Sequence, residues 1–372
     1  MKYYLIAGEA SGDLHASNLI KSIKQRDPDA KFRAWGGDRM QKEGANIIKH
    51  INELSFMGFA EVLLNLSTIL NNIKFCKTDI IDYQPDVVIF IDYPGFNLRI
   101  ASFVRKQNIK TIYYISPQVW AWHKSRVKKI KRDIDKMLVI LPFEKDFYLE
   151  HNYDVEFVGH PLLDALKKIN YIPEAEFRNK NNLDKDNPII ALLPGSRKQE
   201  ISKMLHVMCE VSDIFPGYQF VIAGTTAHSE DFYKQFTEKR NIPVVFDQTY
   251  NLLRNSYAAL VTSGTATLET ALIGIPQIVC YKANTISYQI ARRLVDLEFI
   301  SLVNLIMNEE VVKEMIQNDF NITNLVKELK EITENDYYRA EILEKYKLLR
   351  KKLGGTGASA KAAETIIEFL KN

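Results

Sequence analysis

Short runs of consecutive apolar residues alternate along the chain with longer stretches in which apolar residues recur every three or four positions. Such runs are typical of strands buried on both faces of a parallel sheet, and the longer stretches are typical of covering helices. The expected strands are residues 3–7, 32–35, 87–91, 111–115 and 137–141, and then 189–193, 220–223, 244–246, 258–262 and 277–281. This alternation predicts an α/β protein.

The alternation starts twice, on either side of a polar stretch at residues 167–187. We therefore expect two Rossmann-like domains with a cleft between them. The predicted boundaries are a first domain at 1–166, a linker at 167–187, a second domain at 188–335 and a helical tail at 336–372. The tail is interrupted by Gly354-Gly-Thr-Gly357, so its last helix is expected to return to the first domain or to exchange with a partner subunit in a homodimer.

The composition is that of a globular protein with little excess charge. Of the 372 residues, 46% are hydrophobic and 26% are charged, and a net charge of +3 is too small to indicate a nucleic-acid partner. The three cysteines are odd in number and far apart, which favours a reducing compartment over a disulfide framework or a zinc site. We find no signal peptide and no apolar run near the roughly 20 residues that span a bilayer, so we expect a cytoplasmic protein.

The first candidate for chemistry is the turn that follows the apolar run at 189–193. It consists of Pro194, Gly195, Ser196 and Arg197, and helical spacing follows it. At such a strand–helix junction, helix N–H groups and a nearby cation can hold an anion, and the planar guanidinium of Arg197 suits a phosphate. An ordinary turn with a solvated Arg is the alternative.

A second junction of this kind follows the expected strand at 258–262. Its small residues are Ser263, Gly264, Thr265 and Ala266. Small side chains let the backbone approach a diphosphate, while the N–H groups at the helix start stabilise its charge. Glu269 lies one helical turn beyond Thr265 and is placed to accept hydrogen bonds from ribose hydroxyls. Small residues begin many helices in α/β proteins, but two such junctions in one domain favour a nucleotide pocket.

Asp92 directly follows the clearest strand of the first half, at 87–91, and precedes a Pro-Gly turn. A carboxylate at the carboxyl end of a central parallel strand points into the crevice where such sheets bind ligands. The alternative is a helix cap. Because Asn97 can serve as that cap, we favour a catalytic role for Asp92.

The loop after the first strand contains glycines and opens a helix. Its sequence is Gly8-Glu-Ala-Ser-Gly-Asp13, which lacks the third glycine of the dinucleotide-binding fingerprint. It could receive a phosphate or sugar hydroxyls, or it could be a structural turn. Farther along, the apolar segment 56–70 predicts a buried helix or an amphipathic face that touches acyl chains.

Two tryptophans lie beside a run of basic residues. The group consists of Trp120, Trp122, Lys124, Arg126, Lys128, Lys129 and Lys131. Aromatic and basic side chains together are typical of a protein surface that meets anionic lipid headgroups. A solvated basic face is the alternative.

Metal-binding patterns are weak in this sequence. Three Asp-x-Asp pairs occur, at 27–29, 133–135 and 184–186, but each lies in a polar or basic segment rather than at a strand end. The seven histidines have no ligand spacing. We therefore expect no metal and no other cofactor. Asn304, in contrast, lies in an apolar setting, where an amide needs a partner.

Several motifs, in this order and across nearly the whole chain, resemble the lipid-A-disaccharide synthase family. They are Gly8-Glu-Ala-Ser-Gly-Asp13, Phe56-Met-Gly58 with Glu61-Val62, Ser116-Pro-Gln-Val-Trp-Ala-Trp122, Leu141-Pro-Phe-Glu-Lys145, Leu193-Pro-Gly-Ser-Arg197, and Ser263-Gly-Thr-Ala266 with Glu269. The resemblance implies a GT-B glycosyltransferase that joins UDP-2,3-diacylglucosamine to 2,3-diacylglucosamine 1-phosphate. The products would be UDP and a β(1→6) disaccharide, formed at the cytoplasmic face of the inner membrane.

The same resemblance assigns roles to individual residues. Asp92 would be the general base, Arg197 a contact to the UDP diphosphate, and Asn304 a donor-site residue. The acceptor side of the cleft would be lined by Glu9, Ser11, Gly12, Asp13, Met57 and Gly58. Some relatives carry a second acidic residue where this chain has Gly95, which leaves Asp92 as the single carboxylate candidate on its loop.

Three other functions fit parts of the pattern. Another GT-B enzyme, acting on a polyprenyl-linked acceptor, would share the nucleotide pocket. A UDP-sugar 2-epimerase would share the scaffold but would need no acyl-binding surface. A two-domain sugar-binding protein would also have a cleft, but the two phosphate-type junctions argue against it.

Overall fold

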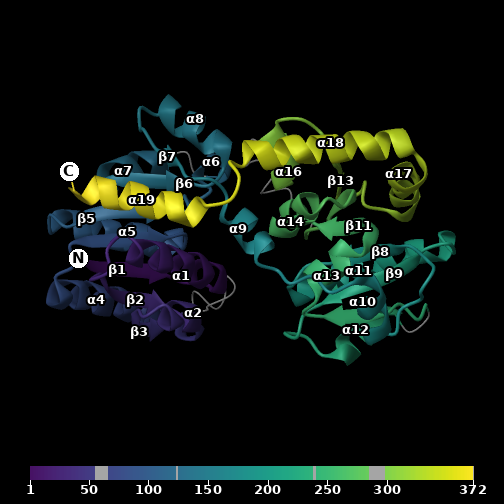
Figure 1. Ribbon diagram of the computed structural model, residues 1–372, viewed down its shortest axis with the longest axis horizontal. Coiled ribbons are helices and arrows are strands. Elements are labelled where there is room, and N and C mark those ends of the chain that lie inside the picture. Colours follow the sequence, from purple (N-terminus) through teal and green to yellow (C-terminus); the bar gives the residue numbers. More distant parts are fainter. Residues whose placement is uncertain (55–65, 123–124, 238–239, 285–297, 372) are drawn as a thin grey trace. The chain divides into compact units, whose positions relative to one another are not determined.

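A computed structural model describes residues 1–54, 66–122, 125–237, 240–284 and 298–371 (Figure 1). The chain forms two compact units, Met1–Asp164 with Leu353–Asn372, and Ala165–Lys352. Each unit contains one parallel sheet with helices packed against it. The predicted α/β class with two parallel-sheet domains is confirmed; the cleft between the domains stays a prediction.

The sheet of the first unit has seven strands in the order β3-β2-β1-β4-β5-β6-β7. The strands are β1 Lys2–Ala7, β2 Lys31–Gly36, β3 Asn46–His50, β4 Val87–Ile91, β5 Lys110–Tyr114, β6 Lys136–Val139 and β7 Glu156–Phe157. All neighbouring strands run parallel. Every residue of β4 is buried, because helices cover both faces of the sheet at its centre.

Helices of the first unit enclose two apolar cores, one on each face of the sheet. They are α1 Ala10–Lys24, α2 Asp38–Lys42, α4 Leu66–Tyr83, α5 Pro94–Lys106, α6 Val119–Trp122, α7 Arg126–Asp133, α8 Pro142–Glu150 and α19 Ala358–Lys371, with the 3-10 turn Ile51–Glu53; α9, Pro161–Lys167, leads into the second unit. One core lies under α1 and α19, and the other lies under α4, α5, α7 and α8.

The sheet of the second unit has six strands in the order β10-β9-β8-β11-β12-β13, again all parallel. The strands are β8 Ile189–Leu193, β9 Gln219–Gly224, β10 Val244–Phe246, β11 Ser256–Thr262, β12 Gln277–Tyr281 and β13 Lys313–Ile316. The helices are α10 Glu174–Lys180, α11 Lys198–Glu210, α12 Glu230–Thr237, α13 Thr249–Arg254, α14 Thr265–Ile273, α16 Leu302–Met307, α17 Ile322–Glu334 and α18 Asp336–Lys352, with the 3-10 turn Val211–Ile214.

Both sheets reverse their strand order at one point, between β1 and β4 in the first and between β8 and β11 in the second. In doubly wound sheets the loops at the carboxyl ends of such strands diverge and leave a crevice for a ligand. The loop with Glu9 follows β1 and Asp92 follows β4, while the Pro194–Arg197 turn follows β8 and Ser263 follows β11. The topology therefore places every one of these loops at a switch point.

The predicted linker at 167–187 is wrong, because this stretch is part of the second unit. Its helix α10 buries Phe177 completely, in the core cluster that contains Ile189 of β8. The buried side chain of Arg178 pairs with Glu174, and it donates a hydrogen bond to the Asn187 carbonyl. A few buried side chains thus hold a mostly polar segment in place.

The tail consists of two helices, as expected, but they belong to different units (Figure 1). Helix α18 packs on α14 and α17 in the second unit, and α19 packs on α1 in the first. Between them, Gly354, Gly355 and Gly357 have positive φ, which glycine adopts without strain. Exchange of α19 between two copies of the chain stays a prediction.

Candidate active site

The loop after β1 lies against the turn that carries Asp92. A Cβ atom added to Gly8 would lie 2.4 Å from the Tyr93 ring, so only glycine lets this ring pack on the loop. Glu9 follows at the start of α1, exposed, and its side chain does not cap the helix. Because β1 and β4 are neighbours, the Glu9 carboxylate acts on Asp92 across the switch point.

Asp92 has the properties of a general base. Its side chain is partly exposed at the carboxyl end of β4, and its pKa is raised to about 6. Burial is the largest cause, and the negative charge of Glu9 adds to it, whereas a hydrogen bond from the Tyr93 backbone N–H lowers the pKa. A carboxylate with this pKa is ionised at neutral pH, but it binds a proton more strongly than an ordinary aspartate.

We expect the rate of the reaction to decline by about tenfold per pH unit below about pH 6, since the base acts only when it is deprotonated. The measurement is kcat and kcat/KM against pH between 3.5 and 9, because the ratio reports the free enzyme. Glu9→Gln, which removes a neighbouring negative charge, is expected to move this acid limb to lower pH. An acid limb near pH 4, where an unperturbed aspartate titrates, would contradict this assignment.

Asp13 is buried and its carboxylate is occupied by the protein itself. It accepts hydrogen bonds from the backbone N–H groups of Gly37 at 2.8 Å, Met40 at 3.1 Å and Arg39 at 3.2 Å. Asp13 therefore holds the start of α2 and does not line an open surface. Ser11, by contrast, is exposed beside Glu9.

Gly12 and Asn97 differ from their expected placement. Gly12 is buried, and a Cβ atom there would lie 3.1 Å from that of Ala7, so α1 can approach β1 closely. Asn97 is fully buried inside α5, and Tyr93, not Asn97, is the N-cap residue. The interpretation of Asn97 as the cap is wrong because the helix begins earlier, at Pro94.

The expected acceptor residues Met57 and Gly58 lie outside the described residues.

In the second unit the turn after β8 leaves its cation accessible. Gly195 has φ +99°, and a Cβ atom there would lie 2.9 Å from a Glu200 carboxylate oxygen, so the turn requires glycine. The Arg197 side chain is 75% exposed, and its ion pair with Glu200 is long, at 3.5 Å. The exposed Ser196 is held through its carbonyl, 2.8 Å from Nε2 of His228. Arg197 is thus free to bind an anion.

The turn after β11 presents the start of α14. Gly264 and Thr265 are exposed, Ala266 is half-buried, and Ser263 donates a hydrogen bond of 3.1 Å to the Ile300 carbonyl. One turn farther along, Glu269 accepts a hydrogen bond of 2.6 Å from the Tyr250 hydroxyl. Burial raises the pKa of Glu269. Exposed N–H groups and a positioned carboxylate are the features expected for a diphosphate and a ribose.

The Asn304 side chain is fully buried, and its amide is saturated by the protein. Its Nδ2 donates to the Val312 carbonyl at 2.8 Å and to Glu314 at 2.9 Å, and its Oδ1 accepts the N–H groups of Val311 and Val312. Glu314 also accepts the N–H group of Ile300 at 2.8 Å. Asn304 therefore supports the segment that holds Ser263, and its contact to the donor stays a prediction.

A family model described as lipid-A-disaccharide synthetase matches residues 3–367. The chain belongs to this family. It is 38% identical to the lipid-A-disaccharide synthase of Syntrophus aciditrophicus and 35% identical to that of Trichlorobacter lovleyi. In both cases the match covers 99% of this chain and 97% of the relative. As a member of this synthase family, the chain is a glycosyltransferase.

Solved structures with a similar fold include an epimerase and a glycosyltransferase. A UDP-GlcNAc 2-epimerase from Neisseria meningitidis, bound to UDP-GlcNAc, has a TM-score of 0.68 at 15% identity over 99% of this chain and 100% of its own. A glycosyltransferase of kitacinnamycin has a TM-score of 0.69 at 13% identity over 99% of both chains. At identities this low, the likeness shows the GT-B fold alone. The epimerase alternative is not favoured, because the chain belongs to the synthase family.

The basic and aromatic group differs from the surface expected for a lipid-A-disaccharide synthase at the membrane. Trp120 is buried and packs edge-on against Phe143, with ring centroids 4.9 Å apart, so its interpretation as a membrane anchor is wrong. On α7, Arg126, Lys128 and Lys131 are exposed and Lys129 is partly exposed. The Trp122 side chain and Lys124 lie outside the described residues.

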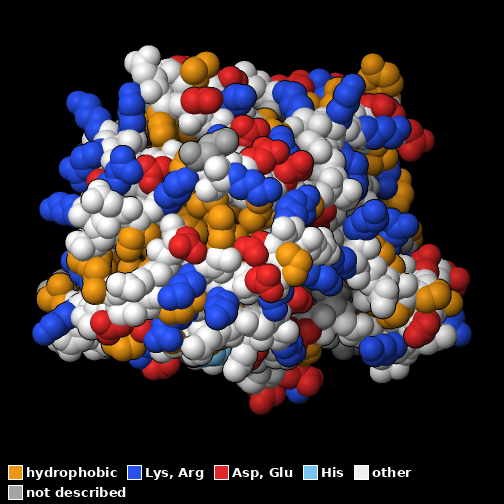
Figure 2. Space-filling view, turned by 60° about the vertical axis from the view of Figure 1, so that its left-hand side comes forward, with side chains coloured by type: hydrophobic (Ala, Val, Ile, Leu, Met, Phe, Trp, Pro, Cys, Tyr) orange, Lys and Arg blue, Asp and Glu red, His pale blue; other side chains and the backbone are white. Residues whose placement is uncertain are grey.

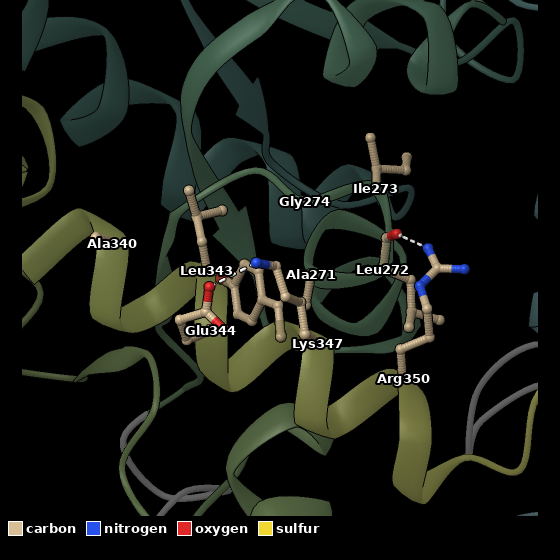
Figure 3. Close-up of a pocket in the computed structure, with 10 residues that line it drawn as sticks. Ala271, Leu272, Ile273, Gly274, Ala340, Leu343, Glu344, Lys347 and Arg350 are labelled. Carbon is tan, nitrogen blue, oxygen red and sulfur yellow. Dashed lines mark hydrogen bonds and ion pairs between the residues drawn. The ribbon is translucent and has the colours of Figure 1, made fainter.

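A pocket of about 370 Å³ lies between α14 and α18, away from the proposed nucleotide site (Figure 3). Residues 271–274 and the facing side of α18 line it, and the Arg350 guanidinium donates to the Leu272 carbonyl. Residues 271–273 form the carboxyl end of α14, whereas Thr265 begins this helix, about 12 Å from Ile273 along its axis. The pocket is therefore separate from the chemistry of the family.

Sequence reasoning missed Tyr93, Tyr250 and Glu314. The two tyrosines look like ordinary aromatic residues near a strand or helix, and Glu314 lies in a mixed polar segment. Each acquires its role through a residue distant in sequence, as Tyr250 does through Glu269. No local pattern marks such pairs.

Proposed function

We propose that this protein transfers 2,3-diacylglucosamine from UDP to 2,3-diacylglucosamine 1-phosphate, forming a β(1→6) disaccharide 1-phosphate and UDP. The family membership supports the reaction. One observation carries the mechanism: each unit has a candidate site at the switch point of its sheet. The site of the first unit contains a carboxylate base, and the site of the second unit contains an accessible Arg beside the start of a helix.

The proposed mechanism is a single displacement, because donor and product linkages have opposite anomeric sense. A base on the face opposite UDP must then accept the proton of the acceptor hydroxyl as the new bond forms. Asp92 fits this role through its position at the end of β4 and its raised pKa. The proton moves from the hydroxyl to the Asp92 carboxylate, and the bond between the sugar and the diphosphate breaks.

The leaving UDP needs stabilisation of negative charge more than protonation, because a diphosphate is already acidic. The exposed Arg197 guanidinium and the N–H groups at the start of α14 can supply it. Glu269, held by Tyr250, is placed one turn inside α14 to accept ribose hydroxyls. These contacts together form our proposed donor site, with no metal or other cofactor required.

The test is UDP release by the purified protein, given the UDP-diacylglucosamine donor with and without the diacylglucosamine 1-phosphate acceptor, in detergent and EDTA. We expect release that depends on the acceptor and is insensitive to the chelator. Equal release without acceptor would indicate another reaction of the UDP-sugar, and inhibition by EDTA would contradict a metal-independent mechanism.

We also propose that exposed basic residues of α7 dock the enzyme on the anionic cytoplasmic face of the inner membrane. Among the described residues, none of the helices has the length and apolar character needed to cross a bilayer. The face drawn in Figure 2 mixes basic with acidic side chains and carries an apolar area near its centre. Lys128, Lys129 and Lys131 lie close together on one helix. Such a group can still contribute about 1 kcal/mol of binding free energy per residue at an anionic lipid surface.

Reversing the charge of Lys128, Lys129 and Lys131 to Glu is expected to weaken binding to anionic vesicles by about 100-fold or more, and to leave UDP release in detergent unchanged. Co-sedimentation with vesicles containing phosphatidylglycerol measures this. The matched control reverses three exposed lysines of the second unit, Lys327, Lys330 and Lys351, for the same change in net charge. Equal loss in both variants would show that overall charge, not α7, governs docking.

A further inference from the structure

We propose that Tyr113 and Asn97 are positioning residues for Asp92, which hold its turn in the orientation that the proton transfer requires. The proposal rests on the proposed role of Asp92 as the base. Neither residue belongs to a motif of the family resemblance, and each reaches Asp92 from a different element.

The turn that carries Asp92 has an unfavourable backbone conformation. Asp92 has φ +44° and Tyr93 has φ +50°, two consecutive left-handed residues that both carry side chains. Such conformations are rare for non-glycine residues and persist only where the surrounding structure holds them. Groups from neighbouring elements therefore have to hold this turn.

Asn97 supplies the first restraint, from the first turn of α5. Its side chain is fully buried, and its Nδ2 donates to the Asp92 carbonyl at 2.7 Å. The same amide lies 3.3 Å from the Ile6 carbonyl and 3.4 Å from the Ile91 carbonyl. One side chain thus joins the ends of β1 and β4 to the turn at the switch point.

Tyr113 supplies the second restraint, from β5. Its side chain is fully buried, and its hydroxyl donates to the same Asp92 carbonyl oxygen. The Asp92 N–H group also donates a hydrogen bond, of 3.2 Å, to the Tyr114 carbonyl. Both peptide groups of Asp92 are therefore fixed by neighbouring elements, and the direction of its carboxylate follows from them.

These restraints also determine how much water reaches the carboxylate. Burial is the largest cause of the raised pKa of Asp92. The titratable groups that interact with it are Glu9, from the loop after β1, and Tyr113, from β5, whereas Tyr93 acts through its backbone N–H group. If the turn relaxes toward a common backbone conformation, the carboxylate becomes more hydrated and its pKa declines.

The chain offers a matched control in the same strand. Tyr114 is also fully buried, but its side chain belongs to the core on the other face of the sheet. Tyr113→Phe and Tyr114→Phe each remove one buried hydroxyl from the same strand, so the second variant tests the loss of that atom from the core by itself. Only the first removes a hydrogen bond to Asp92. Asn97→Leu keeps the branched shape of the side chain and removes the other donor.

The experiment is a ¹³C NMR titration of protein labelled at the aspartate carboxyl carbons, with the Asp92 signal assigned from its absence in Asp92→Asn. In Tyr113→Phe we expect the pKa of Asp92 to fall from about 6 toward the ordinary value of about 3.9. The acid limb of kcat is expected to move with it, and kcat at pH 8 to decline by roughly tenfold to a hundredfold, with KM nearly constant. In Asn97→Leu, the pKa of Asp92 and the acid limb of kcat should move in the same direction as in Tyr113→Phe.

An unchanged Asp92 titration in Tyr113→Phe, or an equal shift in Tyr114→Phe, would overturn the proposal. The titration does not depend on turnover. If the wild-type enzyme released no UDP from the donor and acceptor, the proposed function would fail while the NMR result still decided whether Tyr113 positions Asp92.

Discussion

Asp92→Asn is expected to lower kcat by about 10²–10⁴-fold, because asparagine cannot accept the proton of the acceptor hydroxyl. The substitution keeps the size of the side chain, and the hydrogen bonds from Asn97 and Tyr113 go to the Asp92 carbonyl, not to its carboxylate. KM for both substrates should therefore change little. Disaccharide formation under saturating donor and acceptor measures the effect.

The control is Asp82→Asn, which removes an exposed carboxylate from α4 in the same unit and should leave kcat unchanged. The acid limb near pH 6 should also disappear in Asp92→Asn, since the titrating group is gone. An Asp92→Asn enzyme with a wild-type rate and an intact acid limb would assign the base to another residue.

Arg197→Ala is expected to lower kcat by about 10²–10³-fold and to raise KM for the donor. The guanidinium is largely free in this structure, so its loss removes an interaction with the diphosphate rather than one that stabilises the fold. Arg197→Lys should restore only part of the rate, because an ammonium group is a point charge without the planar fork. Initial rates over a range of donor concentrations measure both constants.

Lys203→Ala removes another exposed cation, from α11 in the same unit, and serves as the control. Its rate and donor KM should match those of the wild type. Thermal unfolding of Arg197→Ala should also match, since the ion pair of its side chain with Glu200 is long. A large loss of stability would mean that Arg197 acts through the fold and not through the donor.

The central strands and the loops after them could be predicted because their determinants are local. A strand buried on both faces has to be apolar along its whole length, as in β4 and β8. The edge strands β3 and β13 were missed, because their residues are mostly half-buried and mix polar with apolar side chains. The same reasoning explains the wrong linker, where a few buried residues, such as Phe177 and Leu183, attach a polar segment to the core.

Residue roles were harder to predict than elements. Asp92 stood out because it directly follows an apolar strand, and Arg197 because it ends the short turn between an apolar strand and a helix. Trp120 was assigned to the surface from its basic neighbours, although its ring packs on Phe143 from α8. Asn304 was expected at the donor, but its amide is used within the loop between α16 and β13.

The sequence by itself determined the α/β class, the repetition of the domain and the strand–turn–helix junctions that mark the two proposed sites, because each depends on residues adjacent along the chain. Only the tertiary structure decided which side chains serve the fold and which stay free for ligands. Asn97 and Tyr113 meet at the Asp92 carbonyl because α5 and β5 pack beside β4. Contacts of this kind depend on strand order and helix packing, and no local pattern encodes them.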